Sequence, residues 1–231
     1  MGASVHRFRE DLKGLEAQVV GGLDLVVSQL DRAQEALGYQ DVELAQIVVA
    51  DDRKLDRRYG EVYHGALELL ARPAPGPEEL RLITALLHIV RCMERMGDQC
   101  VNIATLVPLS GHEAPKDKEI LDAVEKMSLL ARSQVVQARD VLRLREIEVA
   151  GCLAPQDAEI NRLNRAIFQR AVEIGDDFEM REWAMFMILV ARCLERIGDN
   201  TVDIGEQVVF VVTGRLREMN ATEPVSGGPT G

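Results

Sequence analysis

The sequence predicts an all-α fold of six helices, arranged as two tandem three-helix bundles related by internal duplication. Apolar residues recur at helical spacing through almost the whole chain, and no alternating, strand-like stretch interrupts them. Leu, Val, Ala, Ile, Met, Glu and Arg dominate the composition, which favours helices, while aromatic residues make up only 4% of the chain. A segment near the middle of the chain also reappears in its second half.

Breaks rich in glycine and proline separate the helices of the first half. The pattern predicts a first helix over 4–37, which the segment GYQD ends, and a second helix over 42–71. The segment RPAPGP at 72–77 interrupts the chain, and the two glutamates that follow it stand where acidic residues stabilise a helix N-terminus. A third helix is therefore expected to run from there to about residue 107.

The longest break before the C-terminal tail is PLSGHEAPKD, at 108–117, and we expect the domain boundary there. The helices predicted after it are 118–149, 155–175 and 178–216. The predicted units are a first repeat over 1–112, a second repeat over 113–219 and a disordered, Gly/Pro-rich tail over 220–231.

The repeat is clearest between RCMERMGDQCVNI at 91–103 and RCLERIGDNTVDI at 192–204. Eight of the thirteen aligned positions are identical, and most of the mismatches keep shape or polarity. This is too close a match for amphipathic composition alone, so duplication is the simplest explanation. A weaker similarity upstream pairs Asp52 with Asp157.

Both repeated segments place acidic residues along one side of a helix. At about 100° per residue, Glu94, Asp98 and Asn102 fall at roughly 0°, 40° and 80° around the third helix, beside its buried face. We term this set the first stripe. The second stripe, on the sixth helix, consists of Glu195, Asp199, Asp203 and Glu206. Like charges four residues apart destabilise a helix by a few tenths of a kcal/mol per pair, so a compensating charge is expected.

A bound cation on each stripe is one source of that charge. Carboxylates with an occasional amide suit Mg²⁺, Ca²⁺, Mn²⁺ or carboxylate-bound iron better than structural zinc. Ligands from the second and fifth helices are expected to be Asp52, Asp56 and Asp157, with Asn161 as a weaker ligand.

Arginine is the alternative source of positive charge, because an arginine three residues from an acid on a solvated helix face can form an ion pair with it. The arginines in question are Arg91, Arg95, Arg192 and Arg196. A ferritin-like di-iron site is excluded, because Gly97 and Gly198 stand where such a site needs histidine. These glycines are better explained as points of close helix approach.

Charge and composition argue against several function classes. A net charge of −11 would repel nucleic acid. The longest apolar stretches fall short of the roughly 20 residues that span a bilayer, so a membrane would be reached only through a protein partner. The four cysteines show no CxxC spacing and no secretory signal precedes Phe8, which favours buried free cysteines and a cytoplasmic location. His88 is expected to be a core or boundary histidine, and without a catalytic constellation no enzyme is expected.

The segments ARCLERIGDNTVDIGEQVVFVVTG at 191–214 and VRCMERMGDQCVNIA at 90–104 resemble the signature of the PhoU family of phosphate transport system accessory proteins. With the beginning of the chain around Phe8, the resemblance extends over residues 4–217. It implies that Glu94 with Asp98, and Glu195 with Asp199, are ExxxD metal motifs of a multinuclear cluster. Iron is the first expectation for that cluster, with zinc, manganese or magnesium as alternatives.

The resemblance also implies a function: a cytoplasmic negative regulator of phosphate uptake and of the phosphate-starvation response. Such a protein would act as an adaptor between the ATPase subunit of a phosphate ABC transporter and a sensor histidine kinase, and as a homodimer. Two alternatives stay open. One is a metal-dependent hydrolase or oxidase that uses the carboxylate-bound cluster. The other is a helical adaptor without metal.

Overall fold

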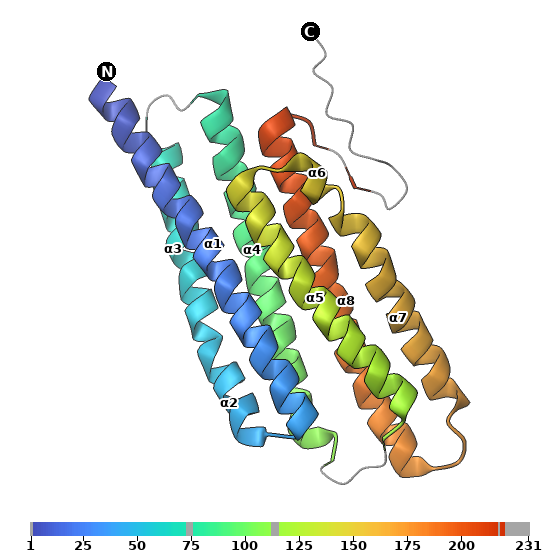
Figure 1. Ribbon diagram of the computed structural model, residues 1–231. Helices are drawn as coiled ribbons and strands as arrows, with labels where there is room; N and C mark the ends of the chain where they lie inside the picture. Colours follow the sequence, from blue (N-terminus) through green and yellow to red (C-terminus); the bar gives the residue numbers. More distant parts are fainter. Residues whose placement is uncertain (1, 73–75, 112–115, 217, 220–231) are drawn as a thin grey trace.

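The computed structural model describes residues 2–72, 76–111, 116–216 and 218–219, and these residues form helices without strands (Figure 1). The predicted all-α fold is confirmed, and so are its six long helices. The helices are α1 (Gly2–Tyr39), α2 (Val42–Asp51), α3 (Arg53–Leu70), α4 (Pro77–Leu106), the 3₁₀-helix η1 (Val107–Leu109), α5 (Lys118–Leu144), α6 (Ile147–Ala150), α7 (Leu153–Glu173) and α8 (Phe178–Thr213).

The long helices lie side by side in an elongated bundle (Figure 1). α4 and α8 pack against each other at its centre, with α1 and α3 covering α4, and α5 and α7 covering α8. α1 also contacts α5, and the buried apolar side chains of both halves form one continuous cluster. The two repeats therefore share a single core. The predicted domain boundary falls partly, and the predicted tail wholly, outside the described residues.

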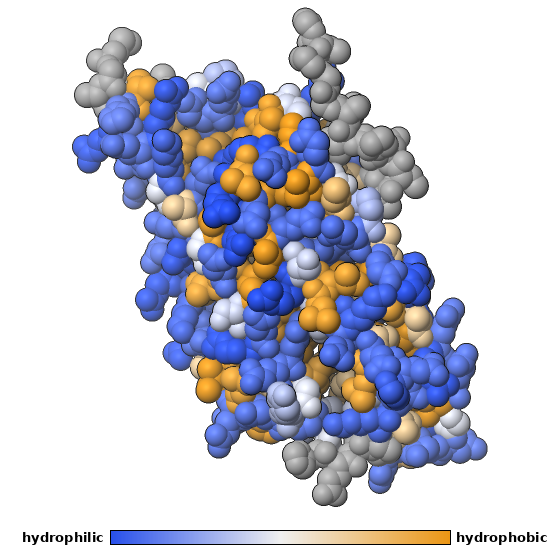
Figure 2. All heavy atoms as spheres, viewed as in Figure 1, coloured by the Kyte–Doolittle hydropathy of each residue, from blue (hydrophilic) through white to orange (hydrophobic). Residues whose placement is uncertain are grey.

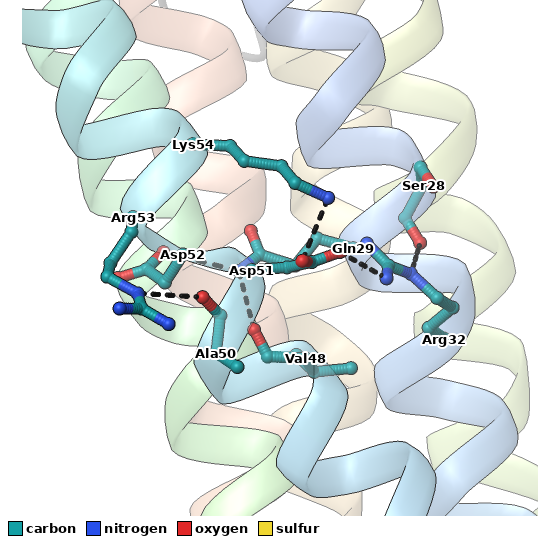
Figure 3. Close-up of polar contacts among 9 residues, drawn as sticks. All are labelled: Ser28, Gln29, Arg32, Val48, Ala50, Asp51, Asp52, Arg53 and Lys54. Atoms are coloured by element: carbon teal, nitrogen blue, oxygen red, sulfur yellow. Dashed lines mark hydrogen bonds and ion pairs between the residues drawn. The ribbon is translucent and has the colours of Figure 1, made fainter.

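The second predicted helix is divided into α2 and α3 at Asp52. The backbone of Asp52 keeps helical angles (φ −57°, ψ −33°), but the chain tightens there, and the Leu55 N–H donates to the Asp52 carbonyl at 2.8 Å. Asp51 forms ion pairs with Arg32 of α1 at 2.6 Å and with Lys54 at 2.8 Å (Figure 3). The two consecutive aspartates at this interruption have different partners, because Asp51 pairs with Arg32 and Lys54 whereas Asp52 accepts a hydrogen bond from Gln29.

The predicted end of the fourth helix at residue 149 was wrong, because α5 ends at Leu144. Arg145 adopts left-handed angles (φ 59°) and its N–H donates to the Val141 carbonyl, a role that glycine usually takes. Its guanidinium donates to the Leu142 carbonyl and, at 2.5 Å, to Glu16 of α1. Those bonds offset a backbone strain of about 1 kcal/mol.

The ends of the last two helices also differ from the prediction. α7 begins at Leu153 rather than at residue 155, after the short helix α6. α8 ends at Thr213 rather than at residue 216, because Gly214 takes positive φ (71°) and closes the helix by donating to the Phe210 carbonyl. These differences leave the central parts of both helices, which carry the predicted ligands, in place.

The surface seen in Figure 2 is largely hydrophilic, with hydrophobic side chains scattered over it. None of the described helices combines the length and the hydrophobicity needed to cross a membrane. Two expectations about single residues were wrong. Cys152 is exposed rather than buried, and His88 is exposed on α4 rather than part of the core.

Candidate functional site

Four acidic residues of the first repeat interact across the contact between α3 and α4. Asp52 precedes α3 and Asp56 lies in its first turn, while Glu94 and Asp98 are on α4. Burial raises the pKa of Asp52, Glu94 and Asp98. The Asp56 carboxylate raises each of these three pKa values further, although the side chain of Asp56 is exposed. The fold thus gathers the predicted carboxylates of two helices into one group.

A recess at Gly97 brings Asp52 close to α4. A Cβ atom at Gly97 would lie 2.5 Å from Leu55 Cδ1 and 3.1 Å from Asp52 Oδ1, so only glycine fits there without displacement. Gln29 of α1 holds the aspartate from the other side, donating from Nε2 to Asp52 Oδ1 at 3.2 Å and to the Val48 carbonyl at 3.4 Å (Figure 3). The Gln29 Oε1 atom is buried without a hydrogen-bond partner among the described residues.

The second repeat builds the same arrangement around Asp157 of α7, which is 8% exposed. A Cβ atom at Gly198 would lie 2.4 Å from Asp157 Oδ1 and 3.1 Å from Gln134 Oε1. Asn161 donates to Asp157 Oδ2 at 2.7 Å, while Oδ1 is buried and unpartnered among the described residues. Burial, reinforced by the Asp199 carboxylate, raises the pKa of Asp157 to about 6.

Gln29 and Gln134 are parts of the site that sequence reasoning missed. Gln134 of α5 donates to the Leu153 carbonyl at 3.2 Å, as Gln29 does to Val48, and its Oε1 is likewise buried without a partner in the described structure. The two glutamines stand 105 residues apart, the same offset that relates Asp52 to Asp157. That shared offset is the signal that would have identified them.

Among the described residues of the stripes, arginine forms an ion pair only with the first acid of each. Through their charge, Arg91 and Arg192 also offset part of the rise that burial causes in the pKa of Asp98 and Asp199. Arg91 pairs with Glu94 at 3.1 Å, and Arg192 pairs with Glu195 in the same way. Among the described residues, neither arginine forms an ion pair with the next acid along its stripe, Asp98 or Asp199. Ion pairing with arginine, the alternative source of positive charge, is therefore confirmed for the two glutamates. The next aspartates along the stripes form no such ion pair among the described residues.

The remaining predicted residues lie at the ends of the stripes. Asp203 lines a solvent-open hollow together with Asp157 and Asp199, so the structure brings these three together. Asn102 is exposed on α4. Glu206 accepts a hydrogen bond from the N–H of Met219 at 2.7 Å and is not among the described residues that line the hollow.

The donor set fits a hard or borderline cation. Each repeat offers carboxylate oxygens and a buried amide oxygen, and in the second repeat the unpartnered Asp157 Oδ1 and Gln134 Oε1 lie beside the same glycine. Buried oxygens without hydrogen-bond donors are costly, and a cation beside them would remove that cost. Metal ligation is therefore the chemistry that this arrangement supports best.

Comparison with known proteins identifies the family. The PhoU domain model matches residues 22–107 and again 124–208, one match in each repeat. The chain belongs to the PhoU domain family. A phosphate-specific transport system accessory protein PhoU homolog from Zymomonas mobilis is 30% identical over 93% of this chain and 90% of its own length. A homolog of the same description from Clostridium acetobutylicum is 26% identical over 92% of this chain and 97% of its own.

Solved structures of the PhoU family show the same fold. The crystal structure of PhoU from Pseudomonas aeruginosa matches with a TM-score of 0.85 at 25% identity, covering 90% of this chain and all of that one. The phosphate transport system regulatory protein PhoU from Streptococcus pneumoniae matches with a TM-score of 0.84 at 24% identity, covering 91% of this chain and 99% of that one. The duplicated six-helix architecture is thus that of the family.

The recess at Gly198 predicts a strong effect of one methyl group. Gly198→Ala places a Cβ against the Asp157 carboxylate, so we expect a loss of about 1–3 kcal/mol in the free energy of unfolding. Gly14→Ala is the matched control, because no neighbouring side chain or segment among the described residues lies within 4 Å of its new Cβ, and alanine is the better helix former by about 0.5–1 kcal/mol. Urea denaturation of both variants measures the difference, and equal effects would contradict the close approach.

The raised pKa of Asp157 predicts a pH dependence of stability in metal-free protein. Unfolding returns this pKa from about 6 to its ordinary 3.8, so between these values the folded state binds more protons. Stability should fall as the pH rises through this window, by up to about 3 kcal/mol. The groups facing Asp157 are Asp199 and Gly198 of α8, Gln134 of α5 and Asn161 of its own helix.

Asp157→Asn removes the titrating group and should flatten this dependence. The variant should be the more stable protein above about pH 6, where the buried charge destabilises the wild type. Urea denaturation in the presence of EDTA, at several pH values between about 4 and 7, measures both effects. Parallel pH profiles for the two proteins would show that Asp157 is not the group responsible.

Proposed function

We propose that this protein is a cytoplasmic negative regulator of phosphate uptake and of the phosphate-starvation response. The observation that carries the proposal is the match of the PhoU domain to both repeats, together with curated relatives described as phosphate-specific transport system accessory proteins. The partners we propose are the ATPase subunit of a phosphate ABC transporter and a membrane sensor histidine kinase. The protein works as an adaptor, as a homodimer, and meets the membrane only through these proteins.

The charge of the molecule supports an adaptor rather than a phosphate receptor. With 38 acidic against 27 basic residues, the protein carries a net charge of −11, which opposes the binding of free phosphate and nucleic acid. The carboxylate groups at Asp52 and Asp157 would repel the anion most strongly. Information about phosphate therefore reaches this protein through contacts with other proteins.

We further propose that each repeat holds metal, as a multinuclear cluster with iron first and zinc, manganese or magnesium as alternatives. The first site consists of Asp52, Asp56, Glu94 and Asp98, with Asn102 at its end; the second consists of Asp157, Glu195, Asp199 and Asp203. The unpartnered buried oxygens beside Gly97 and Gly198 support this assignment. When bound, the metal supplies positive charge directly to the aspartates, which form no ion pair with arginine among the described residues.

A second candidate function is a metal-dependent hydrolase or oxidase. The observation that favours it is the solvent-open hollow beside Asp199 and Asp203, which gives a metal-bound water access to a substrate. Hydrolysis of generic phosphoesters, abolished by Asp199→Ala, would support this enzyme over the adaptor.

Deletion of the gene in its own cell tests the regulatory proposal. In phosphate-rich medium, the deletion strain should take up phosphate faster and express its starvation-induced genes, because the negative signal is lost. Wild-type protein supplied in trans should restore repression. Normal repression in the deletion strain would contradict the proposed function, whatever metal the protein holds.

Elemental analysis of gently purified protein tests the metal sites. Wild type should carry several iron, zinc or manganese ions per chain, and Glu195→Ala/Asp199→Ala should lose those of the second repeat. Asp122→Ala/Glu125→Ala on α5 is the matched control, since it also removes two acids, both exposed and away from the stripes. Similar low metal content in all three proteins would show that the stripes work without metal.

A further inference from the structure

A second kind of metal-ligand cluster lies where α4 meets α8, between the repeats. His88 and Cys92 are one turn apart on α4, and Asp203 reaches them from α8. One ligand atom from each side chain lies within 4.8 Å of the other two. His88 is exposed, Asp203 is half-buried and Cys92 is buried, so the cluster leads from the surface into the contact between the two central helices.

Asp203 reaches this cluster because the second stripe turns around α8. At about 100° per residue, Asp203 lies roughly 80° around the helix from Glu195. Asp203 thus lines the hollow beside Asp157 of α7 and also lies close to His88 and Cys92 of α4. Burial raises the pKa of the Cys92 thiol most, and the nearby Asp203 carboxylate raises it further, in agreement with the short distance between the two groups.

The three donors differ in chemistry from the stripes. An imidazole nitrogen, a thiolate sulfur and a carboxylate oxygen form a ligand set typical of zinc, whereas the stripes offer only oxygen. Zinc binds such donors at about 2.0–2.3 Å, so tetrahedral ligands are closer together than the 4.8 Å limit of this cluster. The side chains would therefore move together by up to about an ångström, with water in the fourth position.

The repeat supplies an internal comparison. The positions equivalent to His88, Cys92 and Asp203 are Leu189, Cys193 and Asn102, at the same offset of 101 residues. A leucine and a neutral amide replace the imidazole and the carboxylate, so the equivalent trio offers only one strong zinc ligand. The ligand cluster is therefore a property of one side of the α4–α8 contact and does not follow from the duplicated architecture.

We propose that His88, Cys92 and Asp203 bind one Zn²⁺ ion that links α4 to α8. The ion joins the first repeat to the second, at a site distinct from the oxygen-ligated sites except for the shared Asp203. Since the ligands come from two helices of the folded protein, zinc binding stabilises the contact between the repeats. The site does not depend on the proposed regulatory function, because it is defined by purified protein and metal alone.

Cobalt substitution tests the proposal, because Co²⁺ replaces Zn²⁺ and reports sulfur ligation through a charge-transfer absorption band. Metal-free, full-length wild type titrated with Co²⁺ should develop this band, and added Zn²⁺ should remove it by displacement. Cys92→Ser should lack the band. His88→Leu, which installs the residue of the equivalent position, should weaken Zn²⁺ binding by at least the roughly 10–100-fold that loss of a supporting contact costs.

Two control variants separate this site from its neighbours. Cys193→Ser removes the equivalent cysteine and should keep the band, while Glu195→Ala/Asp199→Ala disables the second stripe and should also keep it. Circular dichroism confirms that each variant is folded. Absence of the band in folded wild type, or its persistence in Cys92→Ser, would overturn the proposal. Loss of the band in the stripe variant would overturn the claim that the two sites are distinct.

Discussion

The structure depends on two glycines of its central helices, which leave room for a side chain from a neighbouring segment. At Gly97 and Gly198 the backbones of α4 and α8 are open to a carboxylate from a neighbouring helix, Asp52 in one repeat and Asp157 in the other. Each glycine lowers helix propensity by about 1 kcal/mol, and each lies beside acidic residues that repel one another. Helix propensity alone would favour alanine at both positions, but a Cβ atom would meet Leu55 and Asp52 at Gly97, and Asp157 at Gly198, so each recess accommodates a side chain of the neighbouring segment.

Periodicity predicted the long helices but not where the chain interrupts them. The apolar pattern continues across the junction of α2 and α3, because the residues on both sides of Asp52 pack on the same core. α5 ends at Leu144 and is capped by Arg145, which has a Cβ atom yet adopts left-handed angles, and which bonds to Glu16 on a helix far away in sequence. Tertiary contacts determine such a cap, and the local sequence contains no signal that predicts it.

The candidate site likewise has one part that the sequence predicted and another part that it did not. The acids of the stripes were predictable because the duplication repeats them, and a repeated like-charge spacing has to be compensated. Gln29 and Gln134 were missed because a glutamine on an amphipathic helix ordinarily faces solvent, whereas here both are buried and bond to a backbone carbonyl. His88 was predicted to lie in the core or at its boundary because its sequence neighbours are apolar. Its position around α4 instead places the side chain at the surface.

The shared core determines how the two repeats influence each other. Both stripes are on the helices that pack together at the centre, so a rotation of α4 that moves Asp98 also moves the face that contacts α8. Since packed interiors resist deformation, the positions of the two stripes are coupled through the contact between α4 and α8. The two ends of this contact differ in charge, because Asn102 of α4 is neutral and its counterpart on α8, Asp203, is acidic. The duplicated fold therefore holds two related acidic faces of unequal charge in a fixed relation to each other through one shared core.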